Sequence, residues 1–233
     1  MIFVGIDDTD LIDTPGTNQL GKALIARLAG RYRPVLLLRH QLLEDPRVPC
    51  TSKNGSASIL FEPACDQPLA DLSAELRQAV VEWCPPGSDP GLCLTAEVPE
   101  AVARFGRRCQ RELVEQAEAR AVAASHDIYL EGLGGTEGGV IGALAAVGLA
   151  ADGDDGRVVQ LGTWPDDLAG PQDVSRVEAR GIEVRRHDTG ARVHAGRVDV
   201  GKHLRPNRRK GCVILFVVAS LDAAADWTAV RLT

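Results

Sequence analysis

The first ten residues constrain the fold most, because a short apolar run there ends abruptly in three carboxylates. Ile2 to Ile6 predicts a buried strand, and Asp7, Asp8 and Asp10 follow directly. Carboxylates that end a buried strand are typical of ligand sites in open sheets. Adjacent carboxylates repel one another unless a cation neutralises them, and Mg²⁺ commonly does so together with substrate phosphates. We therefore predict a catalytic and metal-binding or phosphate site here; the alternative is an acidic turn that faces water.

The composition is that of a globular chain. Its 233 residues can bury a full core, as one large domain or two closely packed small ones. The net charge of −6 argues against a general polyanion binder, and the 4% of aromatic residues argues against a base-stacking platform. The cysteines form no C-x-x-C pair, which argues against a zinc ribbon and indicates reduced thiols. No segment approaches a membrane-spanning length and the apolar run after Met1 is too short for a signal peptide, so we expect a cytoplasmic protein without a membrane partner.

The apolar periodicity predicts alternating strands and helices. After the first strand we expect a helix from Thr17 to about Gly30, strands at 35–38 and 57–61, a helix at 69–83 and a strand at 92–98. This β-α-β-β-α-β order indicates a ferredoxin-like half, residues 1–98, which carries the acidic motif. Residues 99–233 form a second α/β half packed against it, so the expected class is α/β (α+β).

The second half is predicted in less detail. We expect a long helix over 99–124, strands at 128–130, 158–161 and 212–218, a polar connection over 164–181, and a hairpin-like pair at 182–184 and 191–194. Four arginines at helical spacing form a stripe on the long helix (Arg104, Arg107, Arg108, Arg111). Glutamates one turn further along favour a salt-bridged face, and contact with nucleic-acid phosphates is the alternative.

Several residues outside the acidic triplet are candidates for binding a nucleotide or phosphate. Thr17 is a predicted N-cap, and the positive end of a helix dipole favours an anion, so Thr17 could contact or accept a phosphate; a plain N-cap is the alternative. Thr9 lies inside the acidic motif. Lys53 and Asn54 lie in a turn-rich segment, residues 45–56, whose donors suit phosphate or sugar oxygens, although the segment could be mere connection.

A glycine-rich loop and a basic loop complete the candidates. The first joins a short strand to a small-residue helix, an arrangement that cradles phosphate with backbone N–H groups (Gly134, Gly135, Thr136, Gly138, Gly139). Its spacing matches neither the Rossmann nor the Walker motif, and close helix packing explains part of its glycine content. The basic loop, which precedes the strand at 212–218, offers Lys202, Arg205 and Arg208 as an RNA or phosphate clamp.

Three stretches taken together resemble the archaeal tRNA(Ile2) 2-agmatinylcytidine synthetases. They are Gly5–Asp10 with Thr17, Pro46-x-x-Pro49 with Lys53-Asn54-Gly55, and Val140–Gly148. The resemblance covers most of this chain and only the N-terminal part of those longer enzymes. That part contains a kinase-like domain and a ferredoxin-like domain.

The resemblance implies an ATP- and Mg²⁺-dependent synthetase with a kinase-like step. In that family the C2 carbonyl oxygen of an anticodon cytidine is phosphorylated, and the primary amine of agmatine then displaces the phosphate. Asp7, Asp8 and Asp10 match the metal and nucleotide aspartates, and Thr17 matches a threonine that is itself phosphorylated. Such a step depends on positioning and charge neutralisation more than on a strong base.

The OB-fold and zinc ribbon that grip tRNA in the family have no counterpart in this sequence. The acceptor therefore stays open between tRNA and another nucleoside-like molecule, and the amine between agmatine and another amine. A separate RNA-binding subunit is one way to supply the missing regions. Two other functions also stay open: a non-catalytic RNA- or nucleotide-binding module, and a small-molecule kinase with a non-tRNA acceptor.

Overall fold

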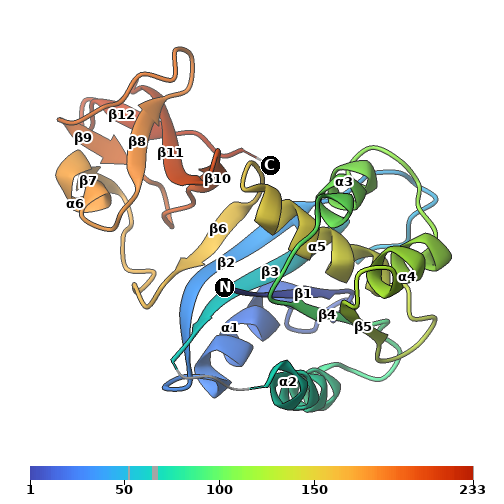
Figure 1. The fold of residues 1–233 in the computed structure, drawn as a ribbon. Coiled ribbons are helices and arrows are strands. Elements are labelled where there is room, and N and C mark those ends of the chain that lie inside the picture. The colour runs from blue at the N-terminus through green and yellow to red at the C-terminus, as the bar shows by residue number, and fades with distance from the viewer. Residues whose placement is uncertain (52, 65–67, 233) are drawn as a thin grey trace.

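The computed structural model describes residues 1–51, 53–64 and 68–232 (Figure 1). It is a mixed α/β protein, which confirms the predicted class. In chain order its elements are β1 (Ile2–Asp7), α1 (Thr17–Arg27), β2 (Tyr32–Gln41), β3 (Gly55–Pro63), α2 (Leu69–Trp83), β4 (Gly91–Thr95), α3 (Glu100–Cys109), α4 (Gln116–Ala124), β5 (Tyr129–Gly132), α5 (Val140–Asp152), β6 (Arg157–Leu161), β7 (Pro171–Asp173), α6 (Val174–Glu178), β8 (Glu183–Arg186), β9 (Arg197–Asp199), β10 (Asn207–Arg209), β11 (Cys212–Ala219) and β12 (Trp227–Ala229).

One sheet runs through the molecule in the order β5-β4-β1-β3-β2-β6-β10-β11-β12-β9-β7, with β8 paired to β11. Its first four strands in sequence, β1 to β4, alternate with α1 and α2 in the predicted order β-α-β-β-α-β, and neighbouring strands among them are antiparallel. The sheet continues past these strands into β5 on one side and β6 on the other. The ferredoxin-like description of residues 1–98 stays a prediction.

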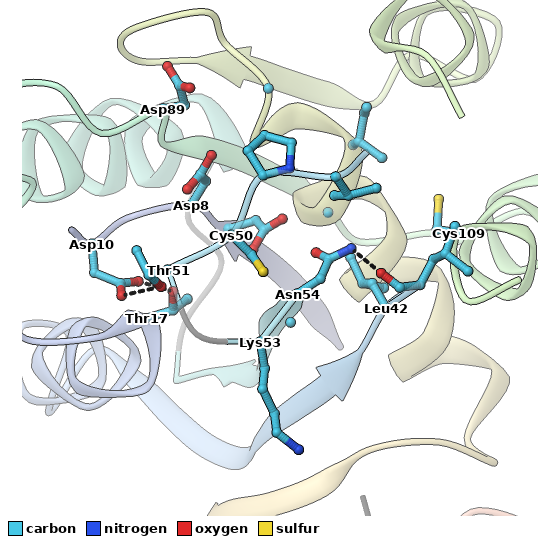
Figure 2. Close-up of a pocket in the computed structure, with 18 of the residues that line it drawn as sticks. Asp8, Asp10, Thr17, Leu42, Cys50, Thr51, Lys53, Asn54, Asp89 and Cys109 are labelled. Atoms are coloured by element: carbon cyan, nitrogen blue, oxygen red, sulfur yellow. Dashed lines mark hydrogen bonds between the residues drawn. The ribbon is translucent and has the colours of Figure 1, made fainter. Parts of the chain in front are cut away.

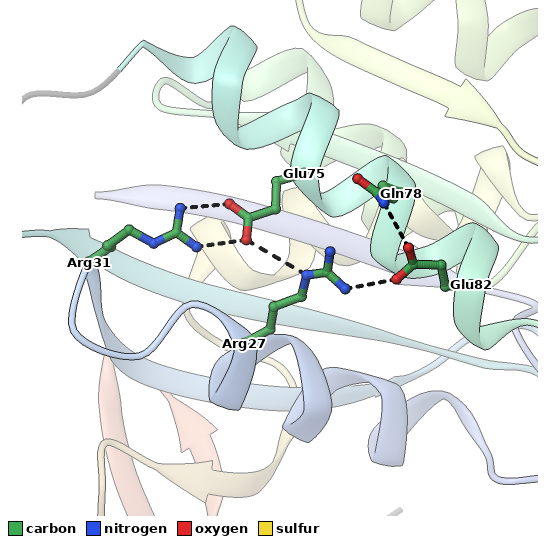
Figure 3. Close-up of polar contacts among 5 residues, drawn as sticks. All are labelled: Arg27, Arg31, Glu75, Gln78 and Glu82. Carbon is green, nitrogen blue, oxygen red and sulfur yellow. Dashed lines mark hydrogen bonds and ion pairs between the residues drawn. The ribbon is translucent and has the colours of Figure 1, made fainter.

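Helices α1 and α2 cover one face of this sheet (Figure 1). Alternate residues of β1 (Ile2, Val4, Ile6) point to that face, because side chains along a strand alternate between faces. On the solvent side the two helices are joined by ion pairs (Figure 3): Arg31 binds Glu75 through both guanidinium ends at 2.6 and 2.7 Å, and Arg27 binds Glu82 at 2.8 Å. These pairs are exposed, so each contributes little to stability.

The other face of the sheet is covered by α3, α4 and α5. Helix α5 lies against β1, β3 and β4, and its buried residues, such as Ala143 and Val147, join a core with α3 and α4. The prediction of one long helix over 99–124 is wrong. α3 ends at Cys109, and α4 begins anew at Gln116 behind a capping box in which Glu115 and Glu118 bind each other's backbone N–H groups.

The break between α3 and α4 divides the predicted arginine stripe. Arg107 pairs with Glu100 at 2.6 Å and also with Asp152, and Arg108 pairs with Glu112 at 2.9 Å and Glu118 at 3.1 Å. These contacts confirm the salt-bridged interpretation for Arg108; Arg107 is salt-bridged too, but to Glu100 and Asp152 and not to the glutamates one turn further along.

The strands from β7 to β12 and helix α6 form a smaller lobe, coloured orange to red in Figure 1. It has its own apolar core, which includes Val174, Val184, Val198 and Leu215. The segment predicted as a polar connection contains β7 and α6. The expected hairpin-like pair is present as a single antiparallel bridge between Arg185 and Arg192, flanked by backbone hydrogen bonds, and β8 also pairs in parallel with β11.

The predicted domain boundary at residues 98–99 stays a prediction. The packing groups the elements differently: α5 lies on the sheet that β1 to β4 form, α3 and α4 pack against α5, and the smaller lobe begins after β6. Within the described ranges no helix has the length and apolar character needed to span a membrane.

Candidate functional site

A cavity of about 290 Å³ opens beyond the C-terminal end of β1, an interior strand of the sheet (Figure 2). Segments that are far apart in the sequence meet there: the end of β1, the start of α1, the segment between β2 and β3, and the turn that leads into α5. The first turns of α1 and α5 both reach the cavity wall, through Gly16, Thr17 and Asn18 of the one and Gly138, Ile141 and Gly142 of the other. Two helix N-termini thus lie at the wall of one space, and the positive ends of their dipoles favour an anion there.

Asp7 lies at the end of β1, against the first turn of α5. A Cβ atom on Gly142 would lie 1.7 Å from Oδ2 of Asp7, so only glycine fits at this position. Burial raises the pKa of Asp7 to about 7, and the charge of Asp8 adds to the rise. The carboxylate form of Asp7 is therefore costly unless something positive binds beside it.

Asp8 carries the second carboxylate, and its backbone is in the left-handed region with φ of 53°. This conformation is unfavourable for a residue with a side chain, and such strain is found at functional sites. The pKa of Asp8 is raised to about 6, mainly by burial and then by the charges of Asp89 and Asp10. Asp7 and Asp8 thus both favour a nearby cation.

Asp10 is bound by hydroxyl groups. Thr17 Oγ1 donates to Asp10 Oδ1 at 3.1 Å, and Thr51 Oγ1 donates to Asp10 Oδ2 at 3.3 Å (Figure 2). Thr9, which is fully buried, donates through Oγ1 to Thr17 Oγ1 at 3.0 Å. Thr17 is the first residue of α1 and not its N-cap, which is Gly16, so the N-cap prediction is wrong by one position.

Asp89 is a fourth carboxylate at the site, and sequence reasoning missed it. It precedes β4 and accepts hydrogen bonds from the backbone N–H of Thr136 and, at 3.0 Å, from its hydroxyl. Because β4 runs antiparallel to β1 with Gly91 opposite Asp7, the start of β4 meets the end of β1. The signal in the sequence was Asp89-Pro90-Gly91 directly before a predicted strand.

The other predicted residues differ in where they lie. Thr136 and Gly138 line the cavity; Gly134, Gly135 and Gly139 do not. Gly139 is required by packing, since a Cβ there would lie 2.4 Å from the carbonyl oxygen of Asp89. Lys53 lines the cavity wall, but Figure 2 shows its side chain directed away from Asp8 and Asp10.

Asn54 uses its side-chain amide within the fold, donating to the carbonyl of Leu43 at 2.8 Å. Lys202, Arg205 and Arg208 lie in the smaller lobe and do not line the cavity. Arg205 binds Asp166, and Arg208 is half-buried beside Gly153 at the C-terminal end of α5. The role of these cations as a clamp stays a prediction.

Two more residues at the cavity were not predicted. Arg39 reaches it from β2, and its positive charge acts on the carboxylate of Asp7. Asn18, on the first turn of α1, has a buried Oδ1 with no hydrogen-bond partner. A buried acceptor left unpaired at a cavity wall indicates a site for a donor on a ligand or for a water.

The carboxylates fit a divalent cation only together with a second source of ligands. Among the residues that the structure describes, no group of three or more His, Cys, Asp or Glu side chains is arranged to hold a metal ion. Carboxylates are nonetheless hard oxygen donors, and the pKa values of Asp7 and Asp8 are raised first by burial and then by the neighbouring carboxylates, so a cation would be favourable beside them. Mg²⁺ commonly takes one or two carboxylates and completes its shell with phosphate oxygens and water, which fits this site.

Comparison with known proteins gives one curated relative and several solved structures. The relative, the tRNA(Ile2) 2-agmatinylcytidine synthetase TiaS of Pyrococcus horikoshii, is 31% identical over 159 residues, which cover 64% of this chain and 35% of the relative. A tRNA fluorescent labelling enzyme has a similar fold, with a TM-score of 0.56 and 25% identity over 63% of this chain and 35% of that one. A crystal structure of a TiaS–tRNA(Ile2)–ATP complex is also similar, with a TM-score of 0.51 and 25% identity over 63% of this chain and 36% of that one.

No protein-family model matches the chain. The chain spans only 35% of the length of the curated relative that it matches. Within that span, the resemblance to the tRNA(Ile2) 2-agmatinylcytidine synthetases that the sequence motifs indicated is confirmed.

Proposed function

We propose that this chain carries the ATP-binding and activating site of a synthetase related to the tRNA(Ile2) 2-agmatinylcytidine synthetases. The observation that carries the proposal is the convergence of Asp7, Asp8, Asp10 and Asp89 with the N-termini of α1 and α5 on one cavity. Carboxylates and helix N-termini have opposite preferences, the former for cations and the latter for anions. A metal-bound polyphosphate satisfies both at once.

The relatives support the choice of ATP and of a tRNA acceptor. The curated relative is named as a tRNA(Ile2) 2-agmatinylcytidine synthetase, and one solved relative is a complex with tRNA(Ile2) and ATP. We extend these ligands to this chain as ATP, a cytidine-containing RNA or nucleoside-like acceptor, and agmatine or another primary amine.

Mg²⁺ would be held by Asp7 and Asp8, and when bound it neutralises the charge on the transferring phosphate. The phosphates would lie between the positive dipole ends of α1 and α5, with Arg39 nearby. Thr17 would accept or contact the phosphate, because its hydroxyl already donates to Asp10, which can take its proton. Phosphorylation of a carbonyl oxygen turns that oxygen into a leaving group that an amine can displace.

The test is transfer of label from γ-labelled ATP to the protein in the presence of Mg²⁺. We expect label on the wild type, and at least about 100-fold less on Thr17→Ala and Asp8→Ala, because loss of one catalytic group or charge partner costs about that much. Thr14→Ala is the matched control: it removes a hydroxyl from the same segment that bonds to Leu11 and does not line the cavity.

Label that persists in Asp8→Ala would contradict the assignment of the metal-binding carboxylates. ATP turnover without label on the protein, and without transfer to RNA, would favour a small-molecule kinase. Absence of both label and ATP binding would favour a non-catalytic RNA-binding module.

A further inference from the structure

Four arginines gather at the junction between the smaller lobe and the larger one, a sandwich in which α1 and α2 cover one face of the sheet and α5 with α3 and α4 the other. Of the four, Arg39 also lines the cavity described above. Arg39 on β2 and Arg157 on β6 are direct cross-strand partners, so their side chains leave the same face of the sheet. Arg205 and Arg231 come from the smaller lobe, and their charges act on Arg157 together with that of Arg39. Like charges so close together are unfavourable unless an anion binds among them.

Arg157 is the centre of this group and has no acceptor. Its Nε is buried without a hydrogen-bond partner, and no hydrogen bond or ion pair of its guanidinium is found within the part of the chain that the structure describes. Burial, and then the three neighbouring arginines, lower the pKa of Arg157. A half-buried guanidinium without an acceptor is costly, so its retention requires an explanation.

Two carboxylates lie near the four arginines, Asp155 in the same small cavity as Arg39 and Arg157 and Asp166 beside Arg205, so the group keeps an excess of positive charge. Asp155 accepts from His40 at 2.7 Å and from Gln110 at 3.1 Å, so both of its oxygens already have partners. Asp166 pairs with Arg205 at 3.1 Å. The hydrogen bonds of Arg39 go to a neutral group, the amide oxygen of Gln41, at 3.2 Å, and its charge also acts on Asp7.

We propose that Arg39, Arg157 and Arg231 form a binding site for a phosphate group at the junction of the two lobes. The guanidinium fork suits phosphate oxygens, and an anion would satisfy the free donors of Arg157. The small cavity shared by Arg39 and Arg157 measures about 20 Å³, room for one water at most, so the phosphate lies at the surface. The same chemistry serves a phosphodiester of a polynucleotide or a free phosphate.

The position of Arg39 connects this site with the candidate functional site. Arg39 lines the aspartate cavity as well as the junction. A polynucleotide that places one base in the cavity could therefore run its backbone over Arg157 and Arg231. The phosphate site does not depend on ATP chemistry, so its test is done without ATP.

The first experiment measures the binding of a fluorescently labelled single-stranded RNA oligonucleotide to the full chain by anisotropy, without ATP or Mg²⁺, at increasing salt. Arg157→Gln and Arg231→Gln are compared with wild type. Each should weaken binding and reduce the slope of log affinity against log salt by about 0.7, the value for one lost phosphate contact on a single strand. Arg176→Gln, an exposed charge on α6, is the matched control and should leave the slope unchanged.

The second experiment tests the free anion with inorganic phosphate and pyrophosphate in thermal unfolding. A rise in melting temperature for wild type that is lost in Arg157→Gln and Arg231→Gln, without RNA binding, would support the site and assign it to a free phosphate. If Arg157→Gln does not fold, the comparison with wild type is made with Arg231→Gln, which changes an exposed residue, and with Arg157→Lys, which keeps the charge but not the guanidinium fork. The proposal is overturned if wild type and these variants respond alike to RNA and to both anions.

Discussion

Asp7 and Asp8 combine burial with mutual repulsion. Their pKa values rise because both are removed from water and each lies close to other carboxylates. In the absence of a ligand this arrangement lowers the stability of the folded protein at neutral pH. A bound cation would reverse the cost, so stability and ligand binding are coupled at these two residues.

The raised pKa of Asp7 predicts a pH-dependent free energy of unfolding. Its pKa is about 7 in the folded protein and near 3.8 in the unfolded chain, so the folded state alone keeps the proton between these values. Stability from this group is therefore complete below about pH 4 and is lost as the pH rises toward 7. In urea unfolding at about pH 8 without Mg²⁺, the free energy of unfolding of Asp7→Asn should exceed that of wild type by about 1–4 kcal/mol.

The control for this prediction is Asp13→Asn, an exposed carboxylate in the segment that follows the acidic motif. Its stability should follow the wild-type pH profile. Parallel profiles for wild type and Asp7→Asn would show that Asp7 titrates normally in the folded protein.

Gly142 predicts a steric test of the contact between β1 and α5. A Cβ at this position would lie 1.7 Å from Asp7 Oδ2 and 2.4 Å from its Cγ, so Gly142→Ala must displace the carboxylate. We expect a loss of about 1–3 kcal/mol in urea unfolding, together with loss of nucleotide binding. Asp7→Ala in the same chain removes those atoms and should restore most of the stability but not the binding; additive losses would contradict the contact.

At the scale of elements, the sequence was informative wherever an element is specified locally. Leu72, Leu76 and Val80 recur at helical spacing, and α2 has the bounds that this pattern predicts. The break between α3 and α4 was missed because the helical spacing of charged residues continues across it. Only the backbone contacts of Glu115 and Glu118 reveal a new start.

The candidate site follows the same rule: its residues that are close in the sequence were predicted, and those brought in by strand pairing were not. Asp7, Asp8, Asp10 and Thr17 lie in one short segment, and all of them line the cavity. Asp89 was missed because it reaches the site through the antiparallel pairing of β4 with β1, which residue patterns do not encode. Conversely, Gly139 looked like a phosphate-binding residue, although close packing against Asp89 explains it.

The buried side chain of His40 on β2 links β3 to the turn after α5, so replacing it should lower the stability of the fold substantially. His40 is fully buried and lies between Asp155, at 2.7 Å, and Ser58, at 2.8 Å. His40→Leu leaves the buried Ser58 hydroxyl without its partner and Asp155 with Gln110 alone, and we expect a loss of about 2–4 kcal/mol in urea unfolding. Ser58→Ala combined with His40→Leu should cost less than the sum of the two, since they share one contact. A loss below about 1 kcal/mol for His40→Leu would contradict this account.

At the scale of the whole molecule, each lobe has its own main core, and the lobes meet where β10 and the start of β11 contact β6 and the turn after α5. The sandwich core is built from residues of β1 to β6 and α1 to α5, and the smaller lobe packs around α6, β8 and β11. Between them, β6 and β10 share one pair of residues, Arg157 and Asn207. The phosphate site proposed at this junction requires both lobes, whereas the aspartate cavity is lined by residues 7 to 142 alone.

This arrangement predicts that a fragment ending at Gly162 folds by itself. The fragment retains β6, which protects the edge of β2 and contributes Val158 to the apolar cluster with Leu36, Leu38 and Ala150. We expect a cooperative thermal transition by circular dichroism and retained ATP binding. Binding of phosphate or RNA at the junction should be weakened or lost, because Arg231 is removed. A fragment ending at Gly153 is the control: without β6 it exposes β2 and should be unstable or aggregate. An unfolded 1–162 fragment would show instead that the smaller lobe is needed to hold the sandwich together.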